Sequence, residues 1–145
     1  MEFIEMRPDI CGGRPVIKGT RLEVRFIVDM IESGMSIEEI LSEYSFLSRD
    51  ILEKIKENIR EIKKLIDAAE CFEIDPNRMA GVPVVKGTRL PVIVIYDMLD
   101  LGYTINDILS EYPFLTREIV EKLIKYRSII EPFVRKVTES IPFQR

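Results

Sequence analysis

Apolar residues in the first half of the chain recur mainly at helical spacing. Three such segments follow one another, at about residues 24–33, 37–44 and 49–66. Ser36 with Glu39 three residues later forms a capping-box signature at the start of the second segment. Ser48 provides an N-cap for the third. The pattern therefore predicts three consecutive helices.

A short β-hairpin is predicted ahead of these helices. Residues 15–17 and 20–22 have strand-like composition and flank the pair Lys18-Gly19. Glycine adopts positive φ at no steric cost, which suits a tight turn. Residues 3–6 form one further short strand candidate.

The whole pattern occurs twice. Residues 13–22 return as residues 81–90, an offset of 68 residues that then holds without a gap. We therefore predict a mostly α fold with short β-hairpins (α+β), built as two tandem three-helix, helix-turn-helix-like units, each with an N-terminal hairpin. The expected boundaries are 1–68 and 69–132, followed by an unrepeated C-terminal helix or tail, 133–145. The third helix of the first unit should be one long connector, and its counterpart should stop near Pro132.

Composition favours a globular, non-catalytic protein. The 145 residues are 46% hydrophobic and 32% charged, and no apolar run approaches the ~20 residues of a membrane span. The acidic N-terminus is unlike a signal peptide, so we expect a cytoplasmic protein. Its many Glu, Lys, Arg and Ile residues, few cysteines and absent histidine favour a thermophilic source.

The residue types that the chain lacks argue against further classes of functional site. There is no histidine, and Cys11 and Cys71 form no Cys-x-x-Cys pair, so zinc sites and His-dependent catalysis lose their usual residues. We expect both cysteines to behave as small buried hydrophobes, and we expect no enzyme activity, metal or cofactor. Asp50 and Glu53 are interpreted as capping charges of a helix start. Four aromatic residues are expected in the core, where they fix the angle between helices two and three: Tyr44, Phe46, Tyr112 and Phe114.

Charge is segregated within each copy, although the net charge is −4. The hairpins are basic and the first two helices acidic. In one interpretation the hairpins contact phosphates and the start of the third helix reaches a DNA groove. The predicted DNA contacts are Lys18, Thr20, Arg21, Arg49 and Lys54, with Lys86, Thr88, Arg89, Arg117 and Lys122 in the second copy. In the alternative, the glycines are needed only for the turns, Arg21 and Arg89 pair with Asp29 and Asp97 or with neighbouring acids, and the helices are a generic three-helix arrangement.

The C-terminal tail is amphipathic and locally basic. We interpret it as a segment that docks on a protein partner. The predicted partner contacts are Phe133, Val137, Ile141, Phe143 and Arg145.

Residues 10–22, 34–40 and 44–48, with their second copies, resemble domain-of-unknown-function family 433, most specifically through the run Gly-x-Pro-x-x-x-Gly-Thr-Arg. The resemblance implies winged or homeodomain-like helix-turn-helix units, often antitoxins encoded beside a PIN-like nuclease toxin. Two functions stay open. One is a DNA-binding, antitoxin-like transcriptional regulator that is pseudo-dimeric within one chain and binds operator DNA. The other is a protein-interaction module that acts through the acidic helices or the tail; a homo-oligomer is also open. Only the first copy carries Cys-Gly-Gly, at residues 11–13.

Overall fold

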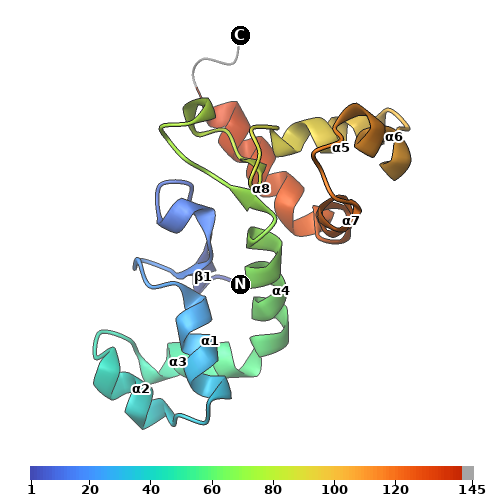
Figure 1. Ribbon diagram of the computed structural model, residues 1–145. Helices are drawn as coiled ribbons and strands as arrows, with labels where there is room; N and C mark the ends of the chain where they lie inside the picture. Colours follow the sequence, from blue (N-terminus) through green and yellow to red (C-terminus); the bar gives the residue numbers. More distant parts are fainter. Residues whose placement is uncertain (142–145) are drawn as a thin grey trace. The chain divides into compact units, whose positions relative to one another are not determined.

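Each half of the chain folds into a short strand pair followed by four helices. The computed structural model describes residues 1–141 and divides into unit 1, Met1–Ile66, and unit 2, Asp67–Arg145. In chain order the elements of the first half are β1 (Ile4–Glu5), η1 (Cys11–Gly13), β2 (Val16–Ile17), α1 (Val24–Glu32), α2 (Ile37–Glu43), α3 (Arg49–Glu57) and α4 (Ile59–Ala69) (Figure 1). Those of the second are β3 (Phe72–Glu73), η2 (Met79–Gly81), β4 (Val84–Val85), α5 (Val92–Asp100), α6 (Ile105–Glu111), α7 (Arg117–Lys125) and α8 (Arg127–Ser140). The predicted fold, mostly helical with short antiparallel strand pairs in two tandem copies, is confirmed.

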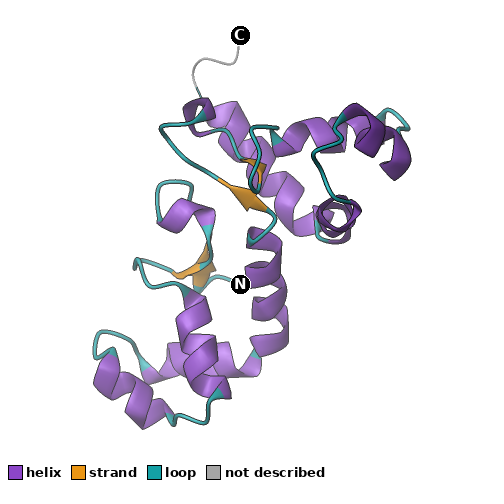
Figure 2. Cartoon of the chain, in the orientation of Figure 1, coloured by secondary structure: helices purple, strands orange, loops and turns teal. Residues whose placement is uncertain are grey.

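The strands are only two residues long (Figure 2). β1 pairs antiparallel with β2, so that Ile4 lies opposite Ile17. The predicted strand at residues 20–22 is not formed; the chain instead returns as a single bridge between Val16 and Glu23. Strands this short are unstable alone, and the burial of Val16 and Ile17 in the core holds them in place. β3 and β4 repeat this pairing in unit 2.

The predicted helix caps are confirmed. Ser36 Oγ accepts the Glu39 backbone N–H at 3.1 Å, and the Glu39 carboxylate accepts the Ser36 N–H at 3.0 Å. Thr104 and Asp107 form the same box in unit 2. Ser48 caps α3 through the N–H of Ile51.

Both units bury the same six helical positions completely. In unit 1 these are Val24, Ile27, Ile40, Leu52, Ile55 and Ile62, and in unit 2 Val92, Ile95, Ile108, Val120, Leu123 and Ile130. They come from four successive helices, so each unit has a core of its own. Within residues 1–141, no helix has the length and apolar character needed to cross a membrane.

The prediction of one long third helix is wrong. The helix breaks at Asn58, and the chain changes direction between α3 and α4 (Figure 1). Asn58 has a φ of −115° and its side-chain amide donates to the Lys54 carbonyl at 2.8 Å. Ile55 and Ile62 on either side of the break enter the same core. The helical spacing of apolar residues therefore continues across Asn58, although the helix itself does not.

The prediction that the last helix stops near Pro132 is also wrong. α8 begins after a break at Tyr126, occupies the repeat position of α4, and continues through Pro132 to Ser140. Proline removes one helical hydrogen bond, but Ile130 and Val134, both completely buried, anchor α8 on either side of it. The C-terminal segment is therefore largely the counterpart of α4, not an unrepeated tail.

Two of the residues predicted to dock on a partner, Phe133 and Val137, pack within unit 2. Val137 is buried, and the Phe133 ring packs on Phe72 with centroids 5.5 Å apart. Arg135 pairs with Asp97 at 3.0 Å. Since these side chains complete the unit, they do not form a free docking face. Ile141 is half-buried at the end of α8, and Phe143 and Arg145 lie outside the described residues.

The predicted burial of the aromatic residues holds only in part. Tyr44 packs against the core of unit 1, and Tyr112 is half-buried in unit 2. The prediction is wrong for Phe46 and Phe114, which are 65% and 59% exposed. Each phenylalanine lies edge-on to the tyrosine two residues before it, with ring centroids 6.1 and 6.0 Å apart.

A left-handed turn precedes β2 and β4 in both units. Cys11, Gly12 and Gly13 have φ of 51°, 62° and 88°. Met79, Ala80 and Gly81 repeat the turn with φ of 52°, 54° and 80°. The Cys-Gly-Gly sequence is therefore not required for this backbone, but Met79 and Ala80 adopt it at a steric cost.

We predict that Ala80→Gly stabilises unit 2. Glycine removes the left-handed penalty of alanine, about 1–2 kcal/mol, but gains about 0.4–1 kcal/mol of unfolded-state entropy. The net gain of roughly 0.5–1 kcal/mol should raise the urea unfolding midpoint. Gly12→Ala in unit 1 is the reciprocal control and should lower it. A lower midpoint for Ala80→Gly would contradict the strain argument.

Candidate functional site

A cleft opens in unit 2 between the hairpin turn and the start of α7. Its volume is about 350 Å³. A lysine lines it from each side, Lys86 from the turn and Lys122 from α7. Phe114 also lines the cleft. The other lining residues are Glu70, Cys71, Val85, Thr88, Leu115, Thr116, Glu118 and Ile119.

The same cleft exists in unit 1, with a volume of about 620 Å³. It is lined by Glu2, Phe3, Lys18, Ile51, Lys54 and Asn58. All but Asn58 correspond, at the 68-residue offset, to residues that line the cleft of unit 2. We call both sites the hairpin clefts. The fold thus brings together two predicted DNA contacts that are distant in sequence, Lys18 with Lys54, and does so again with Lys86 and Lys122.

The lysines of the hairpin clefts are mostly paired. Lys86 Nζ lies 2.8 Å from Glu70, and Lys54 Nζ lies 3.1 Å from Asp50. Lys18 has no ion pair within the described part of the chain. Because an ammonium group carries three protons, one carboxylate partner leaves donors for a ligand.

Lys122 belongs to a small network at the edge of the unit 2 cleft. Asp67 accepts hydrogen bonds from the Tyr126 hydroxyl and from Lys122 Nζ, the latter at 3.0 Å. These bonds, led by that from Tyr126, lower the pKa of Asp67. The Asp67 carboxylate in turn raises the pKa of Lys122, which stays charged at neutral pH.

The threonines of the hairpins hold the turns. The Thr20 hydroxyl donates to the Ile17 carbonyl at 2.8 Å and accepts the Leu22 N–H at 3.0 Å. Thr88 makes the equivalent bonds in unit 2. Both hydrogen-bonding directions of the hydroxyl are therefore used to fix the backbone that carries Lys18 and Lys86.

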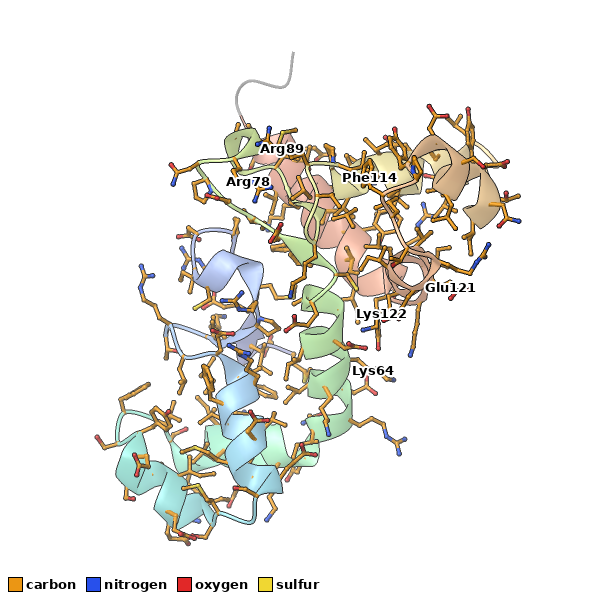
Figure 3. The ribbon with its side chains drawn as sticks, in the orientation of Figure 1. Lys64, Arg78, Arg89, Phe114, Glu121 and Lys122 are labelled. Carbon is orange, nitrogen blue, oxygen red and sulfur yellow. The ribbon has the colours of Figure 1, made fainter. Side chains whose placement is uncertain are left out.

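The hairpin arginines lie apart from the clefts. Figure 3 shows Arg78 and Arg89 well separated from Lys122. Arg21 and Arg89 are exposed and have no ion pair among residues 1–141, so neither makes the considered pair with Asp29 or Asp97. Asp97 pairs with Arg135 instead.

The arginines at the N-termini of α3 and α7 form side-chain hydrogen bonds to the preceding helix. Arg49 Nη2 donates to Glu38 Oε1 at 3.0 Å, and Arg117 donates to the Asn106 side chain in the second copy. Backbone hydrogen bonding, followed by the bond from Arg49, lowers the pKa of Glu38. Both arginines thus link α3 to α2, or α7 to α6, across the short turn.

The sequence pattern did not identify two further contacts of the hairpin. Glu5 Oε2 accepts the Gly19 N–H at 2.7 Å, and Glu73 Oε1 accepts the Gly87 N–H at 3.0 Å. The signal that could have found them is the recurrence of this glutamate at the 68-residue offset.

The second missed feature is a charge cluster that only unit 1 contains. The carboxylate of Glu23, buried near α1, lies 2.9 Å from both Arg14 and Arg25. Unit 2 replaces the three residues with Val82, Pro91 and Ile93. The hairpin clefts are therefore the shared feature of the two units, and this surface is a difference between them.

Cys71 forms part of the cleft wall in unit 2. Its side chain is buried, as predicted, and burial raises the pKa of its thiol to about 11. It is a poor nucleophile at neutral pH. Cys11 is only half-buried, and both cysteines are free. No group of three or more potential metal ligands occurs in the described residues.

Comparison with known proteins matches both units. The family model described as "Protein of unknown function (DUF433)" matches residues 4–57 and 73–126. The uncharacterized protein y4eO of Sinorhizobium fredii is 27% identical over 86 residues, which span 59% of this chain but only 39% of that protein. A crystal structure of a DUF433 member from Anabaena variabilis is similar over 69% of this chain and 94% of its own, at 19% identity and a TM-score of 0.39.

We predict that Cys71 resists alkylation in the native protein. With a pKa near 11, only about one thiol in a thousand is ionised at pH 8. The measurement is the iodoacetamide rate of a Cys11→Ser variant against pH, with the urea-unfolded variant as control. The rate should climb towards pH 11, and a plateau reached by pH 9 would contradict the raised pKa.

Proposed function

The chain belongs to the DUF433 family, whose function is unknown, and from its own geometry we propose that it is a DNA-binding, antitoxin-like transcriptional regulator. The observation that carries the proposal is the duplicated hairpin cleft. In each unit, one cleft is lined by a lysine of the hairpin turn and a lysine of the third helix, α3 or α7. These are Lys18 with Lys54, and Lys86 with Lys122. One chain thereby presents two equivalent basic contacts.

The existing ion pairs of Lys54 and Lys86 leave these two lysines available to phosphate. The side chains of Lys54 and Lys86 are about half exposed, at 51% and 55%. Exposed ion pairs contribute about 0–1 kcal/mol, so a phosphate oxygen exchanges for the carboxylate at small cost. Lys18 has no carboxylate to exchange within residues 1–141.

The contacts favour the DNA backbone over the base edges. Arg49 and Arg117, at the start of the predicted recognition helices, brace α2 and α6. Glu53 and Glu121 are exposed on the same helices and repel phosphate. Phosphate contacts fix the position of a protein on the duplex, and DNA shape supplies sequence preference where base contacts are few.

Two contact faces in one chain correspond to two half-sites. A single-unit protein would need to dimerise to make both contacts. In a tandem chain, binding of the first unit makes binding of the second intramolecular, which raises the overall affinity. The repeat therefore supports a regulator that binds as one chain.

We predict that charge reversal in the hairpin clefts abolishes DNA binding. The variant Lys18→Glu/Lys86→Glu is titrated by fluorescence anisotropy against the DNA upstream of its own gene, beside scrambled DNA, at several salt concentrations. For the unmodified protein, the slope of log affinity against log salt should be about −0.9 for each phosphate contacted.

The matched control is Arg60→Glu/Lys136→Glu, which changes the net charge equally at exposed positions of α4 and α8 that are not among the cleft-lining residues. It should retain most of the affinity. Equal losses in both variants would show a general charge effect, and no preference for the upstream DNA would contradict a regulator.

A protein-interaction module is the second candidate. The exposed phenylalanines favour it, because Phe46 and Phe114 recur at the same turn and aromatic residues dominate protein interfaces. In each unit, an exposed acidic residue of the second helix, Glu43 or Glu111, offers charge that is complementary to a basic partner. A PIN-like nuclease is the proposed protein partner. Phe46→Ala, at a phenylalanine that does not line the unit 1 cleft, would reduce copurification with that nuclease and leave DNA affinity unchanged.

A further inference from the structure

The tip of each hairpin already holds an oxyanion. The Gly19 N–H donates to the Glu5 carboxylate at 2.7 Å, and the Gly87 N–H donates to Glu73 at 3.0 Å. A backbone N–H that binds a carboxylate has the position and direction to bind a phosphate oxygen. The glutamate therefore marks the geometry of an anion site at the turn.

This glutamate is retained where its neighbours change. Between the two copies, Ile4 is replaced by Phe72 and Met6 by Ile74, whereas Glu5 returns as Glu73. The contact to the glycine N–H also recurs. The glutamate and the turn are therefore preserved as a pair, independently of the side chains around them.

Within residues 1–141, neither glutamate has an ion pair that would fix it at the turn. Lys86 pairs with Glu70, not with Glu73, and Lys18 has no ion pair with any residue up to Ile141. Both lysines are direct sequence neighbours of the turn glycines. A phosphate at the turn would thus bind a backbone N–H next in sequence to a lysine, whose side chain adds positive charge to the same hairpin.

The turn glycines are exposed, and the hydrogen bonds of the hairpin threonines hold the turn. A Cβ added at Gly19 or Gly87 would meet no atom within 4 Å beyond the flanking residues, so the Cα side of the turn faces open space. Thr20 and Thr88 hold the turns through bonds that do not involve the glutamates. A phosphate oxygen that binds this N–H therefore has to replace the Glu5 or Glu73 carboxylate, and not the bonds that hold the turn.

We propose that the Gly19 and Gly87 turns are oxyanion sites, occupied in the free protein by the chain's own Glu5 and Glu73 and taken over by a phosphodiester oxygen on binding. The inference rests on the proposed function. The internal glutamates weaken binding to DNA and suppress non-specific binding, because each phosphate must displace a carboxylate.

The test is the variant Glu5→Gln/Glu73→Gln. Glutamine keeps the size of the side chain and an oxygen acceptor but removes the charge that competes with phosphate. DNA affinity should rise by about tenfold relative to the unmodified protein. Circular dichroism and the urea midpoint establish that the variant is folded.

The matched control is Glu43→Gln/Glu111→Gln. These residues are also a repeated pair, are exposed on α2 and α6, and give the same change in net charge. A gain in DNA affinity that is seen only in the Glu5→Gln/Glu73→Gln variant supports the oxyanion sites. An equal gain in both variants overturns them, because the effect would then follow from net charge alone.

A titration with inorganic phosphate separates this inference from the proposed function. The amide resonances of Gly19 and Gly87 should shift saturably in the Glu5→Gln/Glu73→Gln variant and less in the unmodified protein. If no variant binds DNA, the regulator is refuted, and this shift alone decides the oxyanion sites. Unchanged glycine resonances would overturn them.

Discussion

The hydrogen bonds of one threonine hold the hairpin turn in the geometry that positions Lys18 and the Gly19 N–H. Thr20 joins the carbonyl of Ile17 to the N–H of Leu22, and this closes the turn after a strand of two residues. Strand pairing alone is too short to hold that geometry. With the turn closed, Lys18 lines the hairpin cleft and the Gly19 N–H meets Glu5. The same arrangement in unit 2 depends on Thr88.

The two units keep this arrangement while they differ elsewhere. Their cores use the same buried positions, some with small exchanges such as Leu52 for Val120. One exchange is large: Val28 corresponds to Tyr96, whose buried hydroxyl donates to the Leu123 carbonyl at 2.7 Å. In contrast, the charge cluster around Glu23 gives way to apolar residues in unit 2. Replacing a buried ion cluster by apolar side chains of suitable shape is often neutral for stability. The exchange therefore alters one surface without disturbing the fold, and the hairpin clefts remain the shared property of both copies.

Local signals in the sequence were sufficient for much of the fold. The repeat, the helix caps at Ser36 and Ser48, and the Lys18-Gly19 turn each depend on neighbouring residues, and the structure contains them. The break at Asn58 escaped prediction because the apolar spacing continues across it into one core. α8 passes through Pro132 because tertiary packing outweighs one lost hydrogen bond. Phe46 has a core-like residue type, and only the fold determines that it faces solvent. The clefts join residues 36 positions apart, Lys18 and Lys54, so no local pattern contains them.

The central claim is that both hairpin clefts bind DNA in the same way. Amide chemical-shift mapping of the full chain during titration with the upstream DNA tests it most directly. We expect shifts at Lys18, Gly19 and Lys54 together with Lys86, Gly87 and Lys122, with saturation at one protein–DNA ratio. Shifts confined to the acidic helices α2 and α6, or to one unit only, would contradict it.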